Sequence, residues 1–257
     1  MLNKNIENFI DTLNFSYKSP TEMGALESTV TKDKVDLKNP PDGVVAGANV
    51  VQMSAIDNAS VRSAITLSIA AAQLYADTSN DVTSPDIWAA KYIHALAGLG
   101  WTNMSYNYTE SKFDKIDAEV HEEIIPILSA VLGTAAVTAT SVIITALEGL
   151  KKMDDDSPWI KLYGKESSKV SATEFQFSLA DTVDGIANLK TVGIRMDAKK
   201  KINQILFFKL KSEKANLKTV NFGSSQGLPM LLSLNEKLRP KIEDSVSDFI
   251  AALPKRQ

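Results

Sequence analysis

The stretch that separates two fold classes is TVNFGSSQGLPMLL, residues 219–232. A run typical of a strand leads into Gly-Ser-Ser-Gln-Gly at residues 223–227, and a run typical of a helix follows. These five residues match the Gly-x-Ser-x-Gly nucleophile elbow of α/β-hydrolases, in which a serine lies at a sharp turn between a strand and a helix. The sequence on either side decides whether the motif is an active site or a turn.

A serine nucleophile needs a general base, and in α/β-hydrolases a histidine follows the serine in sequence. No histidine follows Ser225, because the chain has only His94 and His121, both far upstream in helix-like segments. The alternation of strand and helix that this fold requires is missing as well. We therefore predict that Ser225 is not a nucleophile. The two glycines are expected to form a turn, with flexible or positive φ, at the end of the last strand.

Helical patterns dominate the part of the chain that lies well before this stretch. IDNASVRSAITLSIAAAQLYAD, residues 56–77, has apolar residues at near-helical spacing after Asn58 or Ser60 as N-cap, which predicts a buried helix. The serine, proline and aspartate at residues 84–86 predict the start of another helix, because each is favoured at or near a helix N-terminus. WTNMSYNYTES, residues 101–111, alternates apolar and polar residues and predicts a strand.

The longest run without a charged residue is IIPILSAVLGTAAVTATSVIITAL, residues 124–147, and its 24 residues are long enough to cross a bilayer. Pro126 and Gly133 interrupt it, and hydroxyl residues at helical spacing form a polar stripe that a lipid-facing helix avoids. We interpret the run as a central buried helix, or as two helical pieces broken near Gly133. Whether it inserts into a bilayer after release stays open.

Beyond residue 152 the hydrophobic pattern changes to the period of two that is typical of strands. Strands are predicted at residues 159–163, 175–179, 189–196 and 217–222. LKTVGIRM, residues 189–196, is expected to form a hairpin with INQILFFKL, residues 202–210, through a charged loop of five residues.

The chain returns to helical patterns after residue 227. We expect two helical pieces separated at Pro240. The second piece carries an apolar stripe of Ile242, Val246, Phe249, Ile250 and Leu253.

Runs of helices followed by runs of strands predict an α+β fold, with a helical N-terminal half packed on an antiparallel β-sheet in the C-terminal half and a closing C-terminal helix. We expect a single soluble domain over residues 1–257. Within it, residues 1–55 form an irregular or edge segment, residues 56–152 are mainly helical, and residues 153–257 supply the sheet and the last helix.

Charge is distributed unevenly along the chain. Residues 1–150 carry nine basic and eighteen acidic side chains, whereas residues 151–257 carry nineteen basic and thirteen acidic ones. The C-terminal part is therefore the candidate anion-facing side. The candidate membrane- or anion-contacting residues are Lys199, Lys200, Lys201, Lys209 and Lys211. The alternative is that these lysines protect a solvated sheet edge from aggregation.

Several classes of chemistry lack their residues. The chain has no cysteine, which excludes disulfides, thiolate nucleophiles and thiolate zinc sites. His94 has no second ligand at helical spacing, which favours a packing role, and the aspartates at 154–156 lack the glycine and glutamate of a calcium loop. No aromatic stacking platform accompanies the lysines, so nucleic acid is not an expected partner. The sequence favours a protein that is not an enzyme and that needs no metal or cofactor.

The N-terminus begins MLNKNIENFIDTLNF and carries Glu7 and Asp11 within its apolar part. It therefore lacks the uncharged core that a secretory signal peptide needs. We expect the protein to be cytoplasmic in the producing cell and then secreted by a route that does not use such a signal.

Four features occur in order between about residues 60 and 225. They are AAQLYAD at 71–77, WAAKYIHALAGLGW at 88–101, the uncharged run at 124–147, and IKLYG at 160–164 followed by FQFSL. Together they resemble the Erwinia virulence factor family and its relatives in bacteria that colonise insects.

The resemblance implies an α+β protein that is exported without a signal peptide and promotes infection or toxicity in an insect gut. Acylation on a cysteine, considered for that family, is impossible in a chain without cysteine. We therefore expect a secreted virulence or insecticidal protein that acts on host gut membranes without catalysis, with membrane lipids, a gut receptor or a non-covalent fatty ligand as partners. The alternative is a lipid- or partner-binding module without toxicity.

Overall fold

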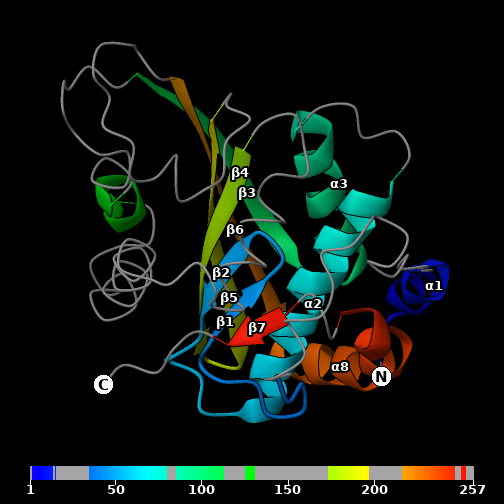
Figure 1. Cartoon of the computed structure of the whole chain (residues 1–257). Coiled ribbons are helices and arrows are strands. Elements are labelled where there is room, and N and C mark those ends of the chain that lie inside the picture. Colours follow the sequence, from blue (N-terminus) through cyan, green and yellow to red (C-terminus); the bar gives the residue numbers. More distant parts are fainter. Residues whose placement is uncertain are drawn as a thin grey trace, which may run out of the picture.

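The computed structural model describes residues 2–13, 15, 35–79, 85–112, 125–130, 173–196, 216–246 and 250–252. Within these residues a layer of helices covers one face of a seven-stranded sheet (Figure 1). This arrangement is the α+β fold that the sequence predicts.

The sheet takes strands from both halves of the chain. Their bounds are β1 Gly43–Ala46, β2 Asn49–Gln52, β3 Thr102–Lys112, β4 Thr173–Val183, β5 Ile186–Met196, β6 Asn216–Gly227 and β7 Ile250–Ala252. The order across the sheet is β3-β6-β5-β4-β2-β1-β7. All neighbours are antiparallel except β2 and β4, which run parallel. The sheet is therefore mixed, because two N-terminal strands extend an antiparallel C-terminal sheet.

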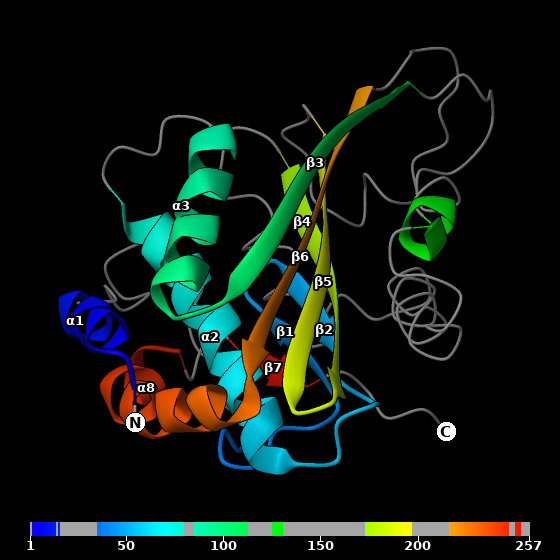
Figure 2. The ribbon, with the colours of Figure 1, turned by 180° about the vertical axis from the view of Figure 1, so that it is seen from behind.

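The helices lie mainly on one side of this sheet. They are α1 Lys4–Thr12, α2 Ala59–Thr78, α3 Pro85–Gly98 and α8 Leu228–Val246. α2 contacts both α3 and α8, and α1 contacts α3. A short helical segment at residues 125–130 lies on the other side of the sheet from α2 and α3 (Figures 1 and 2).

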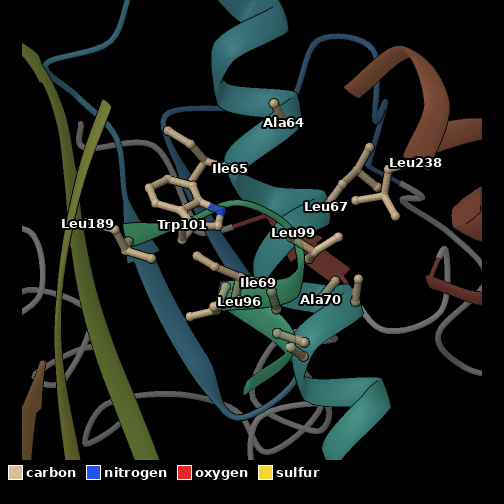
Figure 3. Packing of buried hydrophobic residues seen from close by; sticks show 14 of the residues in the cluster. Ala64, Ile65, Leu67, Ile69, Ala70, Leu96, Leu99, Trp101, Leu189 and Leu238 are labelled. Atoms are coloured by element: carbon tan, nitrogen blue, oxygen red, sulfur yellow. The ribbon is translucent and has the colours of Figure 1, made fainter. Parts of the chain in front are cut away.

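α2 is the central helix of the layer, and the predicted helix at 56–77 is confirmed. The Asn58 side chain accepts hydrogen bonds from the backbone of Ser60 and Val61, which caps the N-terminus as predicted. Fourteen of its twenty residues are buried, so apolar groups face neighbours on nearly every side. Its isoleucines and leucines pack with residues of α3, α8 and the sheet (Figure 3).

The strands predicted at residues 101–111, 175–179 and 217–222 and the helix predicted from Pro85 are also confirmed. Residues 1–55, expected to form an irregular or edge segment, contain regular elements in their described part. That segment contains α1, capped by Asn3, and the hairpin of β1 and β2. Gly47, whose φ of 58° suits a tight turn, lies between the two strands, and the valines within these strands are β-branched residues that favour this conformation.

The predicted hairpin between residues 189–196 and 202–210 is wrong. β5 pairs with β4 along one edge and with β6 along the other over its whole length, so no edge is left for a third strand. The turn before β5 is Asp184-Gly185, with φ of 50° and 76°, and such a two-residue turn matches the twist of a hairpin better than a longer loop. Residues 202–210 and the strand predicted at 159–163 lie outside the described residues.

The end of the chain also differs from the prediction. α8 continues through Pro240 without interruption and buries Ile242 and Val246. Ile250 belongs to β7 and pairs with Ala46 at the edge of β1, so it is not part of a helical stripe. The edge of β1 that β2 leaves open offers backbone hydrogen bonds, and residues 250–252 pair there as a strand. Phe249 and Leu253 lie outside the described residues.

The uncharged run at 124–147 is described only at residues 125–130, which are helical and include the fully buried Leu128. The remainder of the predicted central helix lies outside the described residues. Among the helices that the structure does describe, none combines the length and apolar character that a membrane crossing requires.

Both faces of the sheet carry buried side chains at their centre. On the face under the helices, Leu189 and Phe222 belong to the same core as α2. On the opposite face, cross-strand partners form a continuous row of buried apolar side chains: Val45, Val50, Phe177 and Val192. The sheet therefore separates two apolar layers.

Candidate functional site

The structure places Ser225 within β6 and not at an elbow. Its backbone oxygen accepts a hydrogen bond from the Thr102 hydroxyl at 3.2 Å, and its register partners are Thr102 and Asn188. Gly227 ends β6 and α8 begins at the next residue, so the predicted strand-to-helix junction is confirmed. The predicted turn at Gly223 is wrong, because this residue pairs inside the strand, and neither glycine has a positive φ.

His94 lies on the exposed side of α3, where its ring packs against two aromatic rings. The ring centroids of Phe9 and Tyr75 are each 6.1 Å from that of His94. The packing role predicted for His94 is thus confirmed. His121 lies outside the described residues.

The five candidate lysines, Lys199, Lys200, Lys201, Lys209 and Lys211, also lie outside the described residues. Their contact with a membrane or an anion stays a prediction.

A row of polar side chains lies buried between the helices and the sheet, and we call it the polar row. The Asn49 side-chain amide donates to the Ser178 hydroxyl at 2.9 Å, and the hydroxyls of Ser178 and Thr191 are 2.8 Å apart. These residues belong to β2, β4 and β5, which are adjacent in the sheet. Gln73 of α2 joins the row at its end, where its side-chain oxygen accepts from the Ala48 backbone at 2.9 Å.

Tyr92 of α3 lies over the polar row, and two other aromatic rings contact its ring. It stacks on Trp88 at 5.4 Å between centroids and meets Phe222 of β6 edge-on at 5.7 Å. Trp88 is itself oriented by a hydrogen bond of 2.7 Å from its indole nitrogen to an Asp77 carboxylate oxygen. These ring contacts keep the Tyr92 side chain buried.

Several polar atoms of this region have no hydrogen-bond partner within the described part of the chain. They are Oδ1 of Asn49, Nε2 of Gln73 and the Tyr92 hydroxyl. Burial raises the pKa of Tyr92 well above its ordinary value, and the nearby Asn49 side chain opposes that shift to a smaller extent. The Asn49–Tyr92 contact does not reach full hydrogen-bond geometry, so both atoms keep unused hydrogen-bonding capacity.

A second group of such atoms lies near the start of β3. Nε1 of Trp101, Oγ of Ser224 and Oε1 of Gln226 are buried without a hydrogen-bond partner among the described residues. The Gln226 amide nitrogen donates to the Leu99 backbone oxygen at 3.1 Å, which ties β6 to the end of α3. The motif that first suggested a serine hydrolase thus supplies two residues of the helix–sheet interface.

Sequence patterns did not predict these residues, because polar positions that alternate with apolar ones in a strand normally face solvent. Here helices cover this face of the sheet, so the polar set is buried. The groups offer hydrogen-bond donors and acceptors, and none of them is an ionised acid or base. In the described ranges there is no cluster of three or more histidines and carboxylates that could hold a metal ion. The expected absence of a metal stays a prediction.

No family model matches the chain, and no curated protein matches it. Solved structures that resemble it include the activated Cyt2Ba monomer from Bacillus thuringiensis subsp. israelensis, with a TM-score of 0.39, 12% identity and coverage of 70% of this chain and 97% of that one. A delta-endotoxin has a TM-score of 0.38, 13% identity and coverage of 80% and 88%. The Evf virulence factor has a TM-score of 0.40, 15% identity and coverage of 97% and 92%. Similarities this low do not by themselves assign a family or an activity.

Proposed function

We propose that this protein is a secreted virulence or insecticidal factor of the toxin-like class that acts on host gut membranes without catalysing a reaction. A role of this class is in keeping with the names of the compared structures, and the residues of this chain support it.

The observation that carries the proposal is the second apolar layer of the sheet. The row Val45, Val50, Phe177 and Val192 is buried on the face away from the helices. Residues 125–130, the described beginning of the uncharged run, lie on that same side, and Leu128 is fully buried. The uncharged run that begins there has 24 residues, enough to cross a bilayer, and it is the segment proposed to enter lipid.

The charge asymmetry supplies the second element of the proposal. Lysines at 199–201, together with Lys209 and Lys211, attract an anionic lipid surface, each contributing on the order of 1 kcal/mol when close to it. Host membrane lipids are thus the proposed partner, with a gut receptor as an additional one.

Dye release from liposomes tests the proposal directly. We expect micromolar protein to bind and permeabilise vesicles of phosphatidylcholine and phosphatidylserine at gut-like pH, and to kill or impair insects that ingest it. If the protein neither binds nor permeabilises these vesicles, the membrane mechanism is wrong.

A triple variant separates the lysines from the rest of the protein. Replacing Lys199, Lys200 and Lys201 by alanine should weaken binding to anionic vesicles and reduce its salt dependence. Lys38→Ala is the matched control, because Lys38 is exposed and lies in the acidic N-terminal part. Equal losses in the triple variant and the control would contradict a specific role for these lysines.

A second function is favoured by the unpartnered atoms of Asn49, Gln73 and Tyr92. A non-toxic binding module that carries a fatty ligand would place its polar head near such groups. Native mass spectrometry decides between the two: a lipid that co-purifies with an inert protein supports the binding module, and a ligand-free protein that permeabilises vesicles supports the toxin.

A further inference from the structure

We propose that the turn between β4 and β5 is the part of the described structure that first enters a lipid surface, through the side chains of Val183 and Ile186. This inference rests on the proposed membrane function and names the contact and the lipid chemistry. The chemistry is that of the apolar boundary beneath zwitterionic headgroups, and charge attraction is not required.

Exposure singles out these two residues. Val183 is 55% exposed and Ile186 is 43% exposed, and they are the large apolar side chains that the described residues present to solvent. They are direct cross-strand partners, so their side chains lie on one face of the turn. Only Asp184 and Gly185 separate them in the chain. The two residues therefore form one small apolar patch on the surface.

The turn lies at one end of the sheet, where β6 also ends. Asp184 and Gly185 both have positive φ, at 50° and 76°, which makes a tight hairpin with little room to flex. A Cβ atom built on Gly185 would meet nothing within 4 Å, and the same holds for the neighbouring Gly227. The Leu228 backbone donates to the Gly185 oxygen at 2.9 Å, which fixes the turn against the start of α8 (Figure 2). The apolar pair therefore flanks a turn that is held in place and open to solvent.

Polar residues lie directly behind this turn. The Asn188 side-chain amide donates to the Asp181 carboxylate at 2.8 Å, and Lys190 is exposed one step farther along β5. We call Val183 and Ile186 the tip. An apolar tip with polar residues behind it has the distribution of side chains that a shallow lipid contact needs, because the polar residues remain among headgroups and water.

The size of the tip favours lipid over a protein partner. A stable protein interface buries roughly 800 Å² on each side and uses about 20–30 residues. Two side chains on an exposed turn are far too few for such an interface, whereas each aliphatic side chain that enters lipid adds favourable burial without needing a complementary surface.

Site-specific fluorescence tests the contact, because the protein has no cysteine of its own. Val183→Cys and Ile186→Cys are labelled one at a time with the environment-sensitive dye NBD. Glu236→Cys, at an exposed position of α8, is the matched control. With phosphatidylcholine vesicles we expect NBD emission at both tip positions to rise and shift to shorter wavelength, in high salt as in low salt, and emission at position 236 to stay unchanged. Tip emission that does not respond while the protein is vesicle-bound overturns the inference.

Binding of unlabelled variants gives a second readout. V183T/I186T keeps β-branched side chains and should bind phosphatidylcholine vesicles roughly tenfold more weakly. The exchange variant V183I/I186V keeps the apolar surface and should bind like the parent protein. Circular dichroism melting confirms that each variant folds. If V183T/I186T instead alters self-association without lipid and leaves vesicle binding unchanged, the tip is a protein contact and the inference is wrong.

The two proposals fail in different ways. If V183T/I186T releases dye as the parent protein does, the proposed membrane function stands and the contact through Val183 and Ile186 is wrong. If V183T/I186T weakens vesicle binding but the parent protein releases no dye, the contact through Val183 and Ile186 stands and the toxin-like action is wrong. Absence of any vesicle binding removes both.

Discussion

The two faces of the sheet are both buried at their centre but are built differently. The face under the helices carries hydroxyl and amide side chains at its centre, such as Asn49, Ser178 and Thr191, beside its apolar residues. The central row of the opposite face, from Val45 to Val192, is aliphatic and aromatic, although Gln52 and Thr219 are also buried on that face.

This difference in composition indicates which interactions stabilise each layer. Apolar contacts are non-directional and scale with the area removed from water. Buried polar groups stabilise only when their hydrogen bonds are complete, and several atoms under the helices lack a partner among the described residues. We therefore expect substitutions on the opposite face to act through lost volume, and substitutions under the helices to act through hydrogen-bond pairing.

The largest effect is expected from Phe177→Ala on the opposite face. Phe177 is fully buried, and its removal leaves a cavity in the second apolar layer. Substitutions of this kind lower the free energy of unfolding by about 3–5 kcal/mol. Urea denaturation followed by circular dichroism measures the change. A loss below about 1 kcal/mol would mean that this face is a surface and not a core.

The next effect tests how closely the helix layer approaches the sheet. Gly100 follows α3 and has a φ of 91°, a conformation that favours glycine. A Cβ atom there would lie 2.6 Å from the Ile6 side chain and 2.8 Å from the Gln226 amide. Gly100→Ala should therefore lower the free energy of unfolding by about 2–4 kcal/mol.

Gly227→Ala is the control for this substitution. Gly227 has no positive φ, and a Cβ atom there meets nothing within 4 Å. Its stability should change by less than about 1 kcal/mol. Equal losses at both glycines would show that strain and close approach are not the reason for the effect at Gly100.

Local patterns were sufficient to predict the helix at 56–77 and the strand at 101–111, because capping residues and hydrophobic periods act within a few residues. The fold class followed from the order of these elements. The parallel pairing of β2 with β4 could not be predicted in this way. It joins residues more than a hundred positions apart, and only the whole sheet determines which edge is open.

The polar row could not be predicted for a related reason. Ser178 and Thr191 alternate with apolar neighbours, and this alternation is the same for a solvated face and for a face under helices. At Pro240 a local rule predicted a helix break that does not occur. Packing of Leu238 and Ile242 against the core keeps α8 continuous. Tertiary burial outweighs the loss of one backbone hydrogen bond.

A smaller effect is expected from Ser178→Ala under the helices. The Ser178 hydroxyl bonds to both Asn49 and Thr191, so its removal leaves two buried polar groups with fewer partners. We expect the free energy of unfolding to fall by about 1–3 kcal/mol, although only one oxygen atom is lost. Thr191→Val, which removes the partner at the end of the row, should have a smaller effect in the same urea titration. A neutral Ser178→Ala would mean that the polar row contributes no pairing energy.

The smallest effect at neutral pH is expected from Tyr92→Phe, because the hydroxyl has no hydrogen-bond partner in the described structure. Its removal should change the free energy of unfolding by less than about 1 kcal/mol at pH 8 and can increase it. The difference should grow in alkali. Burial raises the folded-state pKa of Tyr92 above the unfolded value near 10, so the neutral form is favoured in the fold.

The sign of that pH dependence follows from linkage. Above pH 10 the unfolded chain loses the Tyr92 proton while the folded protein retains it, so the parent protein should lose stability as pH rises through this range. Tyr92→Phe lacks this proton and should lose less between pH 8 and pH 11 in parallel urea titrations. Parallel losses in the two proteins would show that the hydroxyl ionises as readily in the fold as in the unfolded chain, and that the layer under the helices admits water where the opposite face does not.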